Sequence, residues 1–194
     1  MNPRTPEPPN NRTPSEAIRV LVVTPDFPPA VGGIQRYVHQ LCAYLSEARV
    51  VVVAPDHPDA PAFDAAQPFR IVRAIRVPGW KRLSFLTLCG QGLWVGLRGR
   101  FDVVVCGHLI AGPVAILLRR LRGVPYVTLA HAQEIRVPRR QRLARRVFRD
   151  AARVVGMSDF ARDTLRSLGV PEDRIRKVTP GLDLQPAAEV GEGG

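Results

Sequence analysis

The chain has 194 residues, 45% of them hydrophobic and 23% charged, which are ordinary values for one globular domain of ample size. It contains no apolar run long enough to span a bilayer, and its first residues lack the charged-then-apolar pattern of a signal peptide. Three cysteines, Cys42, Cys89 and Cys106, lie in apolar surroundings without metal-ligand spacing. An odd number of buried thiols favours a reducing compartment, so we expect a cytoplasmic protein.

The formal net charge is +11 and is carried almost entirely by arginine, with lysine only at Lys81 and Lys177. Such an excess indicates an anionic partner, for example a membrane surface, a nucleic acid or a nucleotide substrate. Compositional bias produces the same excess, so the charge alone does not choose among these partners.

Short apolar strands alternate with helices along the chain. Residues 1–16 are rich in proline and poor in apolar side chains, which predicts a disordered tail, and residues 185–194 are predicted to be flexible. The proline-rich segment 56–68 is predicted to be a loop. Strands are predicted at 18–23, 49–54, 69–77, 102–106, 126–129, 154–156 and 174–178, and helices at 34–45, 83–97, 112–121, 139–152 and 159–168.

This order of elements predicts an α/β fold: a doubly wound, mainly parallel sheet with helices on both faces. The strand at 69–77 is expected near a sheet edge, and the helix at 83–97, apolar on nearly every side, is expected to be largely buried. In such sheets, ligands bind outside the carboxyl ends of the strands. The loops that matter most are therefore 25–33, 107–112, 130–138 and 157–158.

The first of these loops ends in Gly32 and Gly33, where a buried strand passes into a helix N-terminus. The first amides of a helix lack intrahelical partners and carry partial positive charge, so they favour an anion. Glycine has no Cβ, which lets a phosphate or a sugar ring lie directly on the backbone. Two glycines also suit a simple turn, and spacing alone leaves both interpretations open. The pair forms neither a dinucleotide-binding fingerprint nor a Walker loop.

Other loops contribute further candidate residues. His131 follows the fifth predicted strand, where a side chain can face the cleft, donate to a sugar hydroxyl or titrate near neutral pH, and Glu134 could orient it. Both residues also suit simple capping roles. Asp26 and His108 are candidates for lining the same cleft, although the pattern favours a surface position for His108. His39 lies off the apolar stripe of its helix and is expected in solvent.

Two helices carry polar features of a different kind. Ser158 is expected to be the N-cap of the helix at 159–168, and this helix start would also offer a second contact for an anion or hydroxyl. The helix at 139–152 has an arginine-rich face, on which each residue near anionic lipid would contribute about 1 kcal/mol. The predicted membrane or anion contacts are Arg139, Arg142, Arg146 and Arg149. Nucleic acid is less favoured, because no aromatic residues are interleaved.

Four segments occur together and in a fixed order. They are Val22-Val23-Thr24-Pro25-Asp26-Phe27-Pro28-Pro29-x-x-Gly32-Gly33-Ile34-Gln35, His131-x-x-Glu134, Ser158-Asp159-Phe160 and Val178-Thr179-Pro180-Gly181-Leu182-Asp183. Together they resemble the family 4 glycosyltransferases, which have the two-domain GT-B fold, and the resemblance covers residues 19–183.

The resemblance implies a retaining transfer of sugar from a nucleotide-sugar to a sugar, lipid or small-molecule acceptor, without a metal ion or other cofactor. It places Gly32 and Gly33 beside the donor diphosphate and sugar. His131 would contact the transferred sugar or the acceptor, with Glu134 near it as a second catalytic candidate, and Ser158 would lie nearby.

In that family, the Pro-Gly-x-Asp segment leads into a second domain that holds the nucleotide, and this sequence ends shortly after Asp183. We therefore expect a Rossmann-like, acceptor-side domain at residues 17–184, without the C-terminal nucleotide-sugar domain. It would be inactive alone, as either a truncated chain or one member of a split enzyme that a separate GT-B domain protein completes. The alternative is a non-catalytic binding or membrane-tethering module that partners another transferase. The expected location is the cytoplasm, peripheral at the inner face of the cell membrane.

Overall fold

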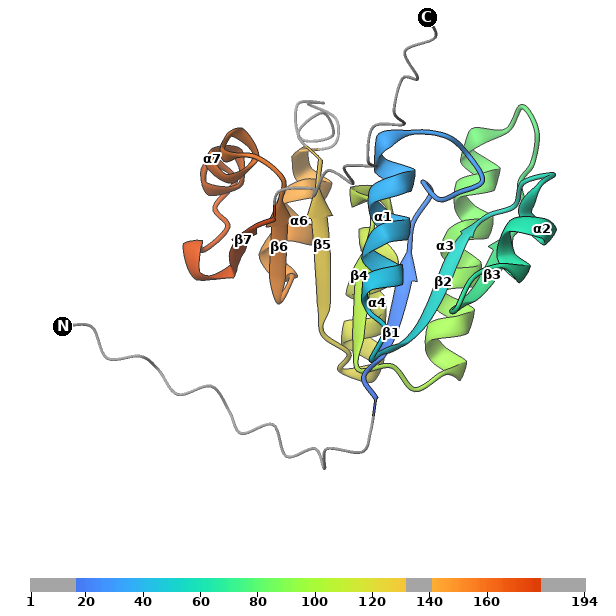
Figure 1. Ribbon diagram of the computed structural model, residues 1–194. Helices are drawn as coiled ribbons and strands as arrows, with labels where there is room; N and C mark the ends of the chain where they lie inside the picture. Colours follow the sequence, from blue (N-terminus) through green and yellow to red (C-terminus); the bar gives the residue numbers. More distant parts are fainter. Residues whose placement is uncertain (1–16, 132–140, 179–194) are drawn as a thin grey trace, which may run out of the picture.

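The computed structural model describes residues 17–131 and 141–178 (Figure 1). Its strands form one parallel sheet. The spatial order is β3 (Arg70–Ala74), β2 (Arg49–Pro55), β1 (Arg19–Val23), β4 (Val103–Cys106), β5 (Tyr126–Ala130), β6 (Arg153–Gly156) and β7 (Ile175–Lys177). The predicted doubly wound α/β fold is confirmed, with β3 at a sheet edge as expected. The tails predicted at 1–16 and 185–194 lie outside the described residues.

Helices cover both faces of the sheet (Figure 1). One face packs against α1 (Gly33–Tyr44) and the short α2 (Ala60–Ala65). The other packs against α3 (Lys81–Arg98), α4 (Gly112–Arg122), α6 (Gln141–Asp150) and α7 (Asp159–Ser167). Right-handed crossovers explain this division, because the chain winds outward from β1 in one direction and from β4 in the other.

The strands are buried on both sides, which explains their continuous apolar sequences. Val20 pairs with Val50 and Val22 with Val52, and Val22 and Val52 are fully buried. Parallel strands covered by helices on both faces have no solvent side that would require alternating polar residues. The same runs of β-branched residues that predicted the strands therefore supply both halves of the core.

Two local predictions were wrong. The segment 56–68 contains the helix α2, which starts after Asp59 with a proline in its first turn, a position that proline favours. The helix α3 is not largely buried: Leu88, Gly92 and Gly96 are its buried residues, whereas Leu86 is 61% exposed. Small residues share the core side with Leu88, whereas Leu83, Leu86 and Trp94 remain exposed on the outer side. No described helix combines the length and apolar character that crossing a membrane requires.

A buried tyrosine attaches the arginine-rich helix α6 to the sheet. Tyr126 in β5 is fully buried, and its hydroxyl donates to the carbonyl oxygen of Val147 at 2.6 Å. Burial raises the pKa of Tyr126, so the hydroxyl keeps its proton and remains a donor. Ala144, Val147 and Phe148 form the buried stripe of α6, which leaves its arginines on the outside.

We expect Tyr126→Phe to lower the free energy of unfolding by about 1–2 kcal/mol, because a buried hydrogen bond is lost. Urea denaturation followed by circular dichroism measures this change. Tyr44→Phe is the matched control, since Tyr44 is 75% exposed and should change stability by less than about 0.5 kcal/mol. Equal changes in the two variants would contradict the role given to the Tyr126 hydroxyl.

Candidate functional site

The loops after β1, β4 and β5 meet at Gly107, where the direction of winding changes. The Gly107 amide donates to the carbonyl of Val23 at 3.0 Å, which ties the end of β4 to the end of β1. The Gly107 carbonyl oxygen lies 2.8 Å from His131 Nε2, which ties the end of β5 to the same point. Carboxyl-end loops on either side of such a switch point form the usual ligand crevice of an open α/β sheet.

His131 is buried in this crevice, with 8% of its surface exposed. Because a carbonyl oxygen can only accept, Nε2 carries the proton that is donated to Gly107. The other ring nitrogen, Nδ1, is then an acceptor in the neutral histidine. Its neighbour Glu134 and the arginine Arg139 lie outside the described residues, so their predicted roles stay predictions.

His108 and Asp26 face each other across the crevice. The Ile110 amide donates to His108 Nδ1 at 3.2 Å, so the proton of the neutral ring is on Nε2, which lies 4.0 Å from Asp26 Oδ2. The His108 side chain is only 13% exposed, and its ring centroid is 6.2 Å from that of His131. The surface position favoured for His108 is therefore wrong: the residue is largely buried close to Asp26 and His131, and its part in a ligand cleft stays a prediction.

Gly32 and Gly33 lie exposed at the N-terminus of α1. Gly32 is extended, and neither glycine has the positive φ that only glycine adopts readily. A Cβ on Gly33 would meet no atom within 4 Å, and one on Gly32 would meet only the flexible side chain of Gln35. The turn itself therefore does not require this glycine pair. Because neither residue has a side chain, the backbone at the N-terminus of α1 is left uncovered.

Ser158 caps α7, as predicted. Its hydroxyl oxygen accepts from the Ala161 amide at 3.2 Å. The pairing of Ala130 with Gly156 puts this cap at the same edge of the sheet as His131. The adjacent Asp159 accepts two hydrogen bonds from Lys177 Nζ at 2.7 Å, which lower the pKa of its carboxyl group.

The loop after β1 is fixed by a residue that the sequence did not suggest. Arg73 in β3 donates to the carbonyl oxygens of Pro28 at 2.7 Å and Pro55 at 2.9 Å, and it pairs with Asp64 of α2 at 2.6 Å. Its guanidinium carbon also lies 5.8 Å from the centre of the Phe27 ring. One side chain thus holds the loop, the end of β2 and α2 together.

His39 belongs to the same supporting structure and is not solvated as expected. Its ring packs edge-on against Phe27 and Phe63, with centroids 6.0 and 5.4 Å away, and close to Phe69. Its Nε2 lies 2.6 Å from Gln67 Oε1. Phe63 and Gln67 come from the segment 56–68 that the sequence assigned to a loop, which explains why periodicity within α1 alone placed His39 in water.

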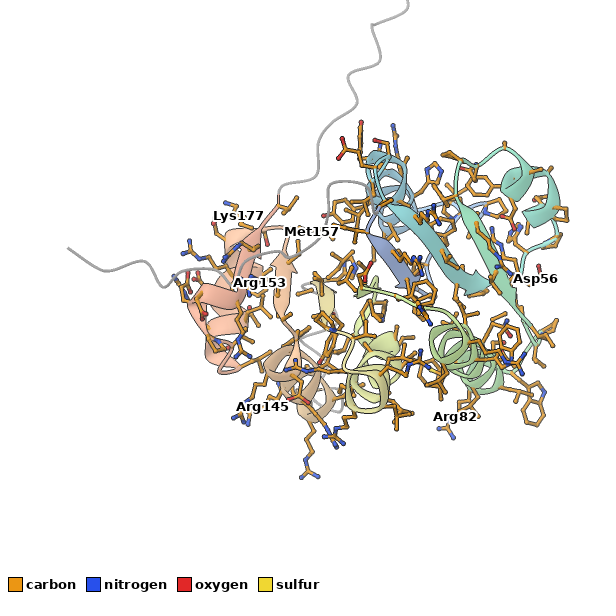
Figure 2. All side chains as sticks on the ribbon, turned by 90° about the horizontal axis from the view of Figure 1, so that it is seen from below. Asp56, Arg82, Arg145, Arg153, Met157 and Lys177 are labelled. Carbon is orange, nitrogen blue, oxygen red and sulfur yellow. The ribbon has the colours of Figure 1, made fainter. Side chains whose placement is uncertain are left out.

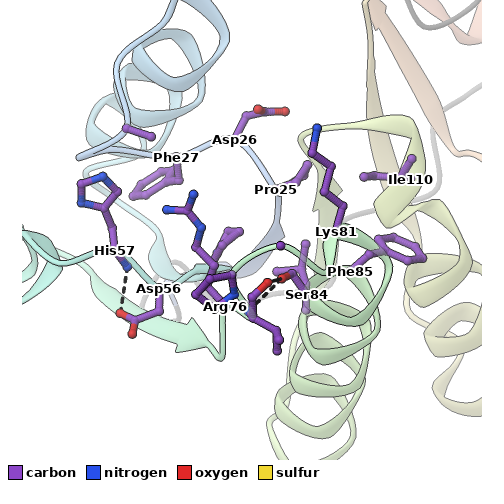
Figure 3. Close-up of a pocket in the computed structure, with 16 residues that line it drawn as sticks. Pro25, Asp26, Phe27, Asp56, His57, Arg76, Lys81, Ser84, Phe85 and Ile110 are labelled. Carbon is purple, nitrogen blue, oxygen red and sulfur yellow. Dashed lines mark hydrogen bonds between the residues drawn. The ribbon is translucent and has the colours of Figure 1, made fainter.

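A hollow of about 590 Å³ opens beside Asp26, bordered by the ends of β1 and β2 and the start of α3 (Figure 3). Arg76 extends into it from the segment that follows β3, and Lys81 from the first turn of α3. Sequence reasoning missed both, because they follow an edge strand whose loop was not counted among the ligand-binding loops.

A second hollow, of about 440 Å³, lies on the outer side of α6 and is lined by Arg120, Arg142, Arg145, Arg146, Arg149 and Asp150.

The cysteines are poor candidates for chemistry. Burial raises the pKa of Cys42 and Cys106 to about 12 and that of Cys89 to about 11, so the thiols stay protonated and weakly nucleophilic at neutral pH. Within residues 17–131 and 141–178, no group of three or more histidine, cysteine, aspartate or glutamate side chains could hold a metal ion.

The sequence model of Glycosyltransferase Family 4 matches residues 31–186. A GDP-mannose-dependent alpha-(1-6)-phosphatidylinositol monomannoside mannosyltransferase of Mycobacterium tuberculosis is 30% identical over 177 residues, which cover 85% of this chain and 45% of that protein. The protein of the same name from Mycolicibacterium smegmatis is 28% identical, over 84% of this chain and 44% of its own length. The chain thus spans about half the length of the curated relatives it matches.

Solved structures share the fold at low sequence identity. Anabaena HepE, solved in complex with UDP-glucose, has a TM-score of 0.66 and 15% identity, over 86% of this chain and 44% of HepE. The UDP-N-acetylglucosamine 2-epimerase of Rickettsia bellii has a TM-score of 0.59 and 13% identity, over 85% of this chain and 45% of that enzyme. The likeness identifies the Rossmann-like half of a GT-B fold and, at such identities, says nothing more.

Gly107→Ala should lower the free energy of unfolding by about 1–3 kcal/mol, because the new Cβ overpacks a buried site. It would lie 2.6 Å from Oγ1 and 2.7 Å from Cβ of the fully buried Thr24. The matched control is Gly33→Ala, whose Cβ enters open space and should leave stability within about 0.5 kcal/mol. Thermal or urea denaturation of both variants tests this, and a stable Gly107→Ala protein would contradict the tight junction of β1 and β4.

Proposed function

Because the chain belongs to glycosyltransferase family 4, we propose that it is the acceptor-side half of a retaining transferase that moves a sugar from a nucleotide-sugar to an acceptor. The observation that carries the proposal is the convergence of three loops on Gly107, with His131 buried on one side and the open helix terminus of α1 on the other. The hydroxyl groups of a sugar need hydrogen-bonding side chains, and a diphosphate needs backbone amides that donate to it. The carboxyl-end edge of this sheet carries both kinds of group.

Each predicted residue has a definite part in this proposal. The amides at Gly32 and Gly33 would receive the donor diphosphate, because the helix N-terminus carries partial positive charge and no side chain covers it. His131 would use Nδ1 to accept a hydrogen bond from a sugar hydroxyl, since Nε2 is committed to Gly107. Asp26 and His108 would line the acceptor side of the same crevice, and the Ser158 helix start would border it. No metal ion is assigned to the reaction.

We propose that transfer also requires a nucleotide-sugar-binding domain, on the same polypeptide or on another. The chain matches 45% of its mycobacterial relatives, whose names specify GDP-mannose. A GDP-sugar is therefore the first donor to test. UDP-glucose, the ligand of the structurally similar HepE, is the second.

A second candidate function is a non-catalytic, membrane-tethering module for another transferase. The hollow on α6 favours it, because five arginines and only one acidic side chain line that surface. Peripheral attachment to an anionic bilayer, such as the inner face of the cell membrane, would follow from these charges. In this alternative, the crevice around His131 takes no part in transfer.

His131→Gln separates the two functions. Glutamine can still donate to the Gly107 carbonyl, so the fold should be kept, but the acceptor nitrogen of the ring is lost. Combined with a nucleotide-sugar-binding domain, the variant should transfer sugar at least about a hundredfold more slowly than the wild-type chain, an effect typical of a lost catalytic contact. Release of radiolabelled product measures the rate. Unchanged transfer in the complex would reject the catalytic assignment and support the tethering module.

Gly33→Ala tests the donor side independently. The added methyl group costs the folded chain nothing but would lie where the diphosphate is proposed to approach. We expect the KM for the nucleotide-sugar to rise about tenfold in the reconstituted complex, as one favourable anion contact is lost. Steady-state kinetics with varied donor concentration measures this. Wild-type KM and kcat would place the diphosphate elsewhere.

A further inference from the structure

The side chain of Arg73 is nearly buried, although it belongs to the edge strand β3. It is 11% exposed, and its guanidinium group makes two hydrogen bonds to the Asp64 carboxylate, at 3.0 and 2.6 Å. It also donates to the carbonyl oxygens of Pro55 at 2.9 Å and Pro28 at 2.7 Å. A carboxylate pairs a buried charge, but the remaining N–H groups still need acceptors. Because main-chain oxygens fill that need here, the same side chain joins the end of β2 to the loop after β1.

The loop after β1 has few backbone groups by which it can be fixed. The adjacent prolines at positions 28 and 29 have no amide hydrogen, so the main chain there can only accept hydrogen bonds. Within the described ranges, residues 28–32 take part in the hydrogen bond from Arg73 and in one from the Arg36 amide to the Gly32 carbonyl oxygen, at 3.1 Å. The second bond belongs to the first turn of α1. The bond from Arg73 is therefore the one that ties this segment to the sheet.

The aromatic residue just before this segment is held by the same arginine. Phe27 is 3% exposed, and its ring packs edge-on against Phe63 and Phe69, with centroids 6.2 and 6.3 Å away. The guanidinium carbon of Arg73 lies 5.8 Å from the centre of the Phe27 ring. Beyond this anchor the chain is exposed, with Val31 entirely in solvent, until α1 begins. The glycine pair at the start of α1 is thus positioned from the loop side by contacts that centre on Arg73.

We propose that Arg73 is a positioning residue for sugar transfer: through the Pro28 carbonyl it holds the loop after β1 so that the amides of Gly32 and Gly33 face the donor diphosphate. The inference rests on the proposed function and adds a residue that itself touches neither substrate. Hydrogen bonds weaken steeply when the donor is poorly aligned, so a loose loop offers its amides to the phosphate only part of the time. A loop that is competent for about a tenth of the time lowers the apparent donor affinity about tenfold.

Nitrogen-15 relaxation of the full chain measures whether Arg73 holds the loop. We expect amide order parameters of about 0.85 at Gly32 and Gly33 in the wild type and below about 0.6 in Arg73→Gln. Arg73→Lys keeps the charge opposite Asp64 but lacks the planar fork that reaches several acceptors at once, so the loop should loosen there too. Tyr126→Phe is the control, because it removes a buried hydrogen bond to α6, which covers the sheet face opposite α1 (Figure 2). It should leave both order parameters unchanged.

Steady-state kinetics in a complex with a nucleotide-sugar-binding domain then separates positioning from folding. With GDP-mannose as the donor, Arg73→Gln and Arg73→Lys should raise KM about tenfold and change kcat by less than about twofold, because the bound donor restores the loop. A variant that is only destabilised loses active protein, not donor affinity. Tyr126→Phe should therefore keep the wild-type KM.

Three results would overturn the proposal. Wild-type order parameters in both Arg73 variants would show that the loop does not depend on this residue. A loosened loop with a wild-type KM would show that its position does not affect the donor. An equal rise of KM in Tyr126→Phe would assign the effect to a general loss of stability.

Failure of the proposed function has a different signature. A wild-type complex that transfers no sugar would reject that function, and the role of Arg73 in transfer with it. The order parameters need neither donor nor partner, so they show separately whether Arg73 holds the loop. A wild-type complex that transfers sugar with no dependence of KM on Arg73 would reject the positioning role alone.

Discussion

The close junction of three strand ends at Gly107 is the constraint on which the rest of this edge depends. The Gly107 amide donates a hydrogen bond to β1, and its carbonyl oxygen is hydrogen-bonded to His131 after β5. Because Gly107 has no side chain, Thr24 can pack directly against it. A parallel sheet leaves its carboxyl-end loops free to diverge, and divergence is greatest where the winding direction changes. At Gly107 the backbone itself holds the loops together, and its carbonyl oxygen orients the buried His131.

The fold was predictable because its signal is local. Runs such as Val50–Val53 are apolar at every position, and only a strand covered on both faces accommodates that pattern. These strands alternate with segments of helical spacing, so consecutive strands are joined by helical crossovers. Because such crossovers are right-handed, few sheet topologies are possible. The helix α2 escaped prediction because it is short. Its proline, typical of a loop, is equally typical of a first helical turn.

The candidate site was predictable only where chain order and sheet geometry coincide. His131 and Ser158 were found because each directly follows a strand. His108 and His39 were misplaced because their environment comes from residues distant in sequence: Asp26 for His108, and the aromatic rings of α2 and its flanks for His39. Arg73 gave no signal at all, since an arginine in an edge strand is expected to face water.

The packing of α3 links the core to the surface. Leu88, Gly92 and Gly96 face inward at intervals of four residues, and a Cβ on Gly96 would come within 2.5 Å of Leu118 in α4. Gly92 and Gly96 bring the helix close to its neighbours, while Leu88 packs into the core between the sheet and α3. If water were the only partner outside, polar residues would be expected on that side. Trp80, Leu83 and Leu86 are exposed there instead. The packing that closes the core against α3 therefore also leaves apolar side chains on its outer surface.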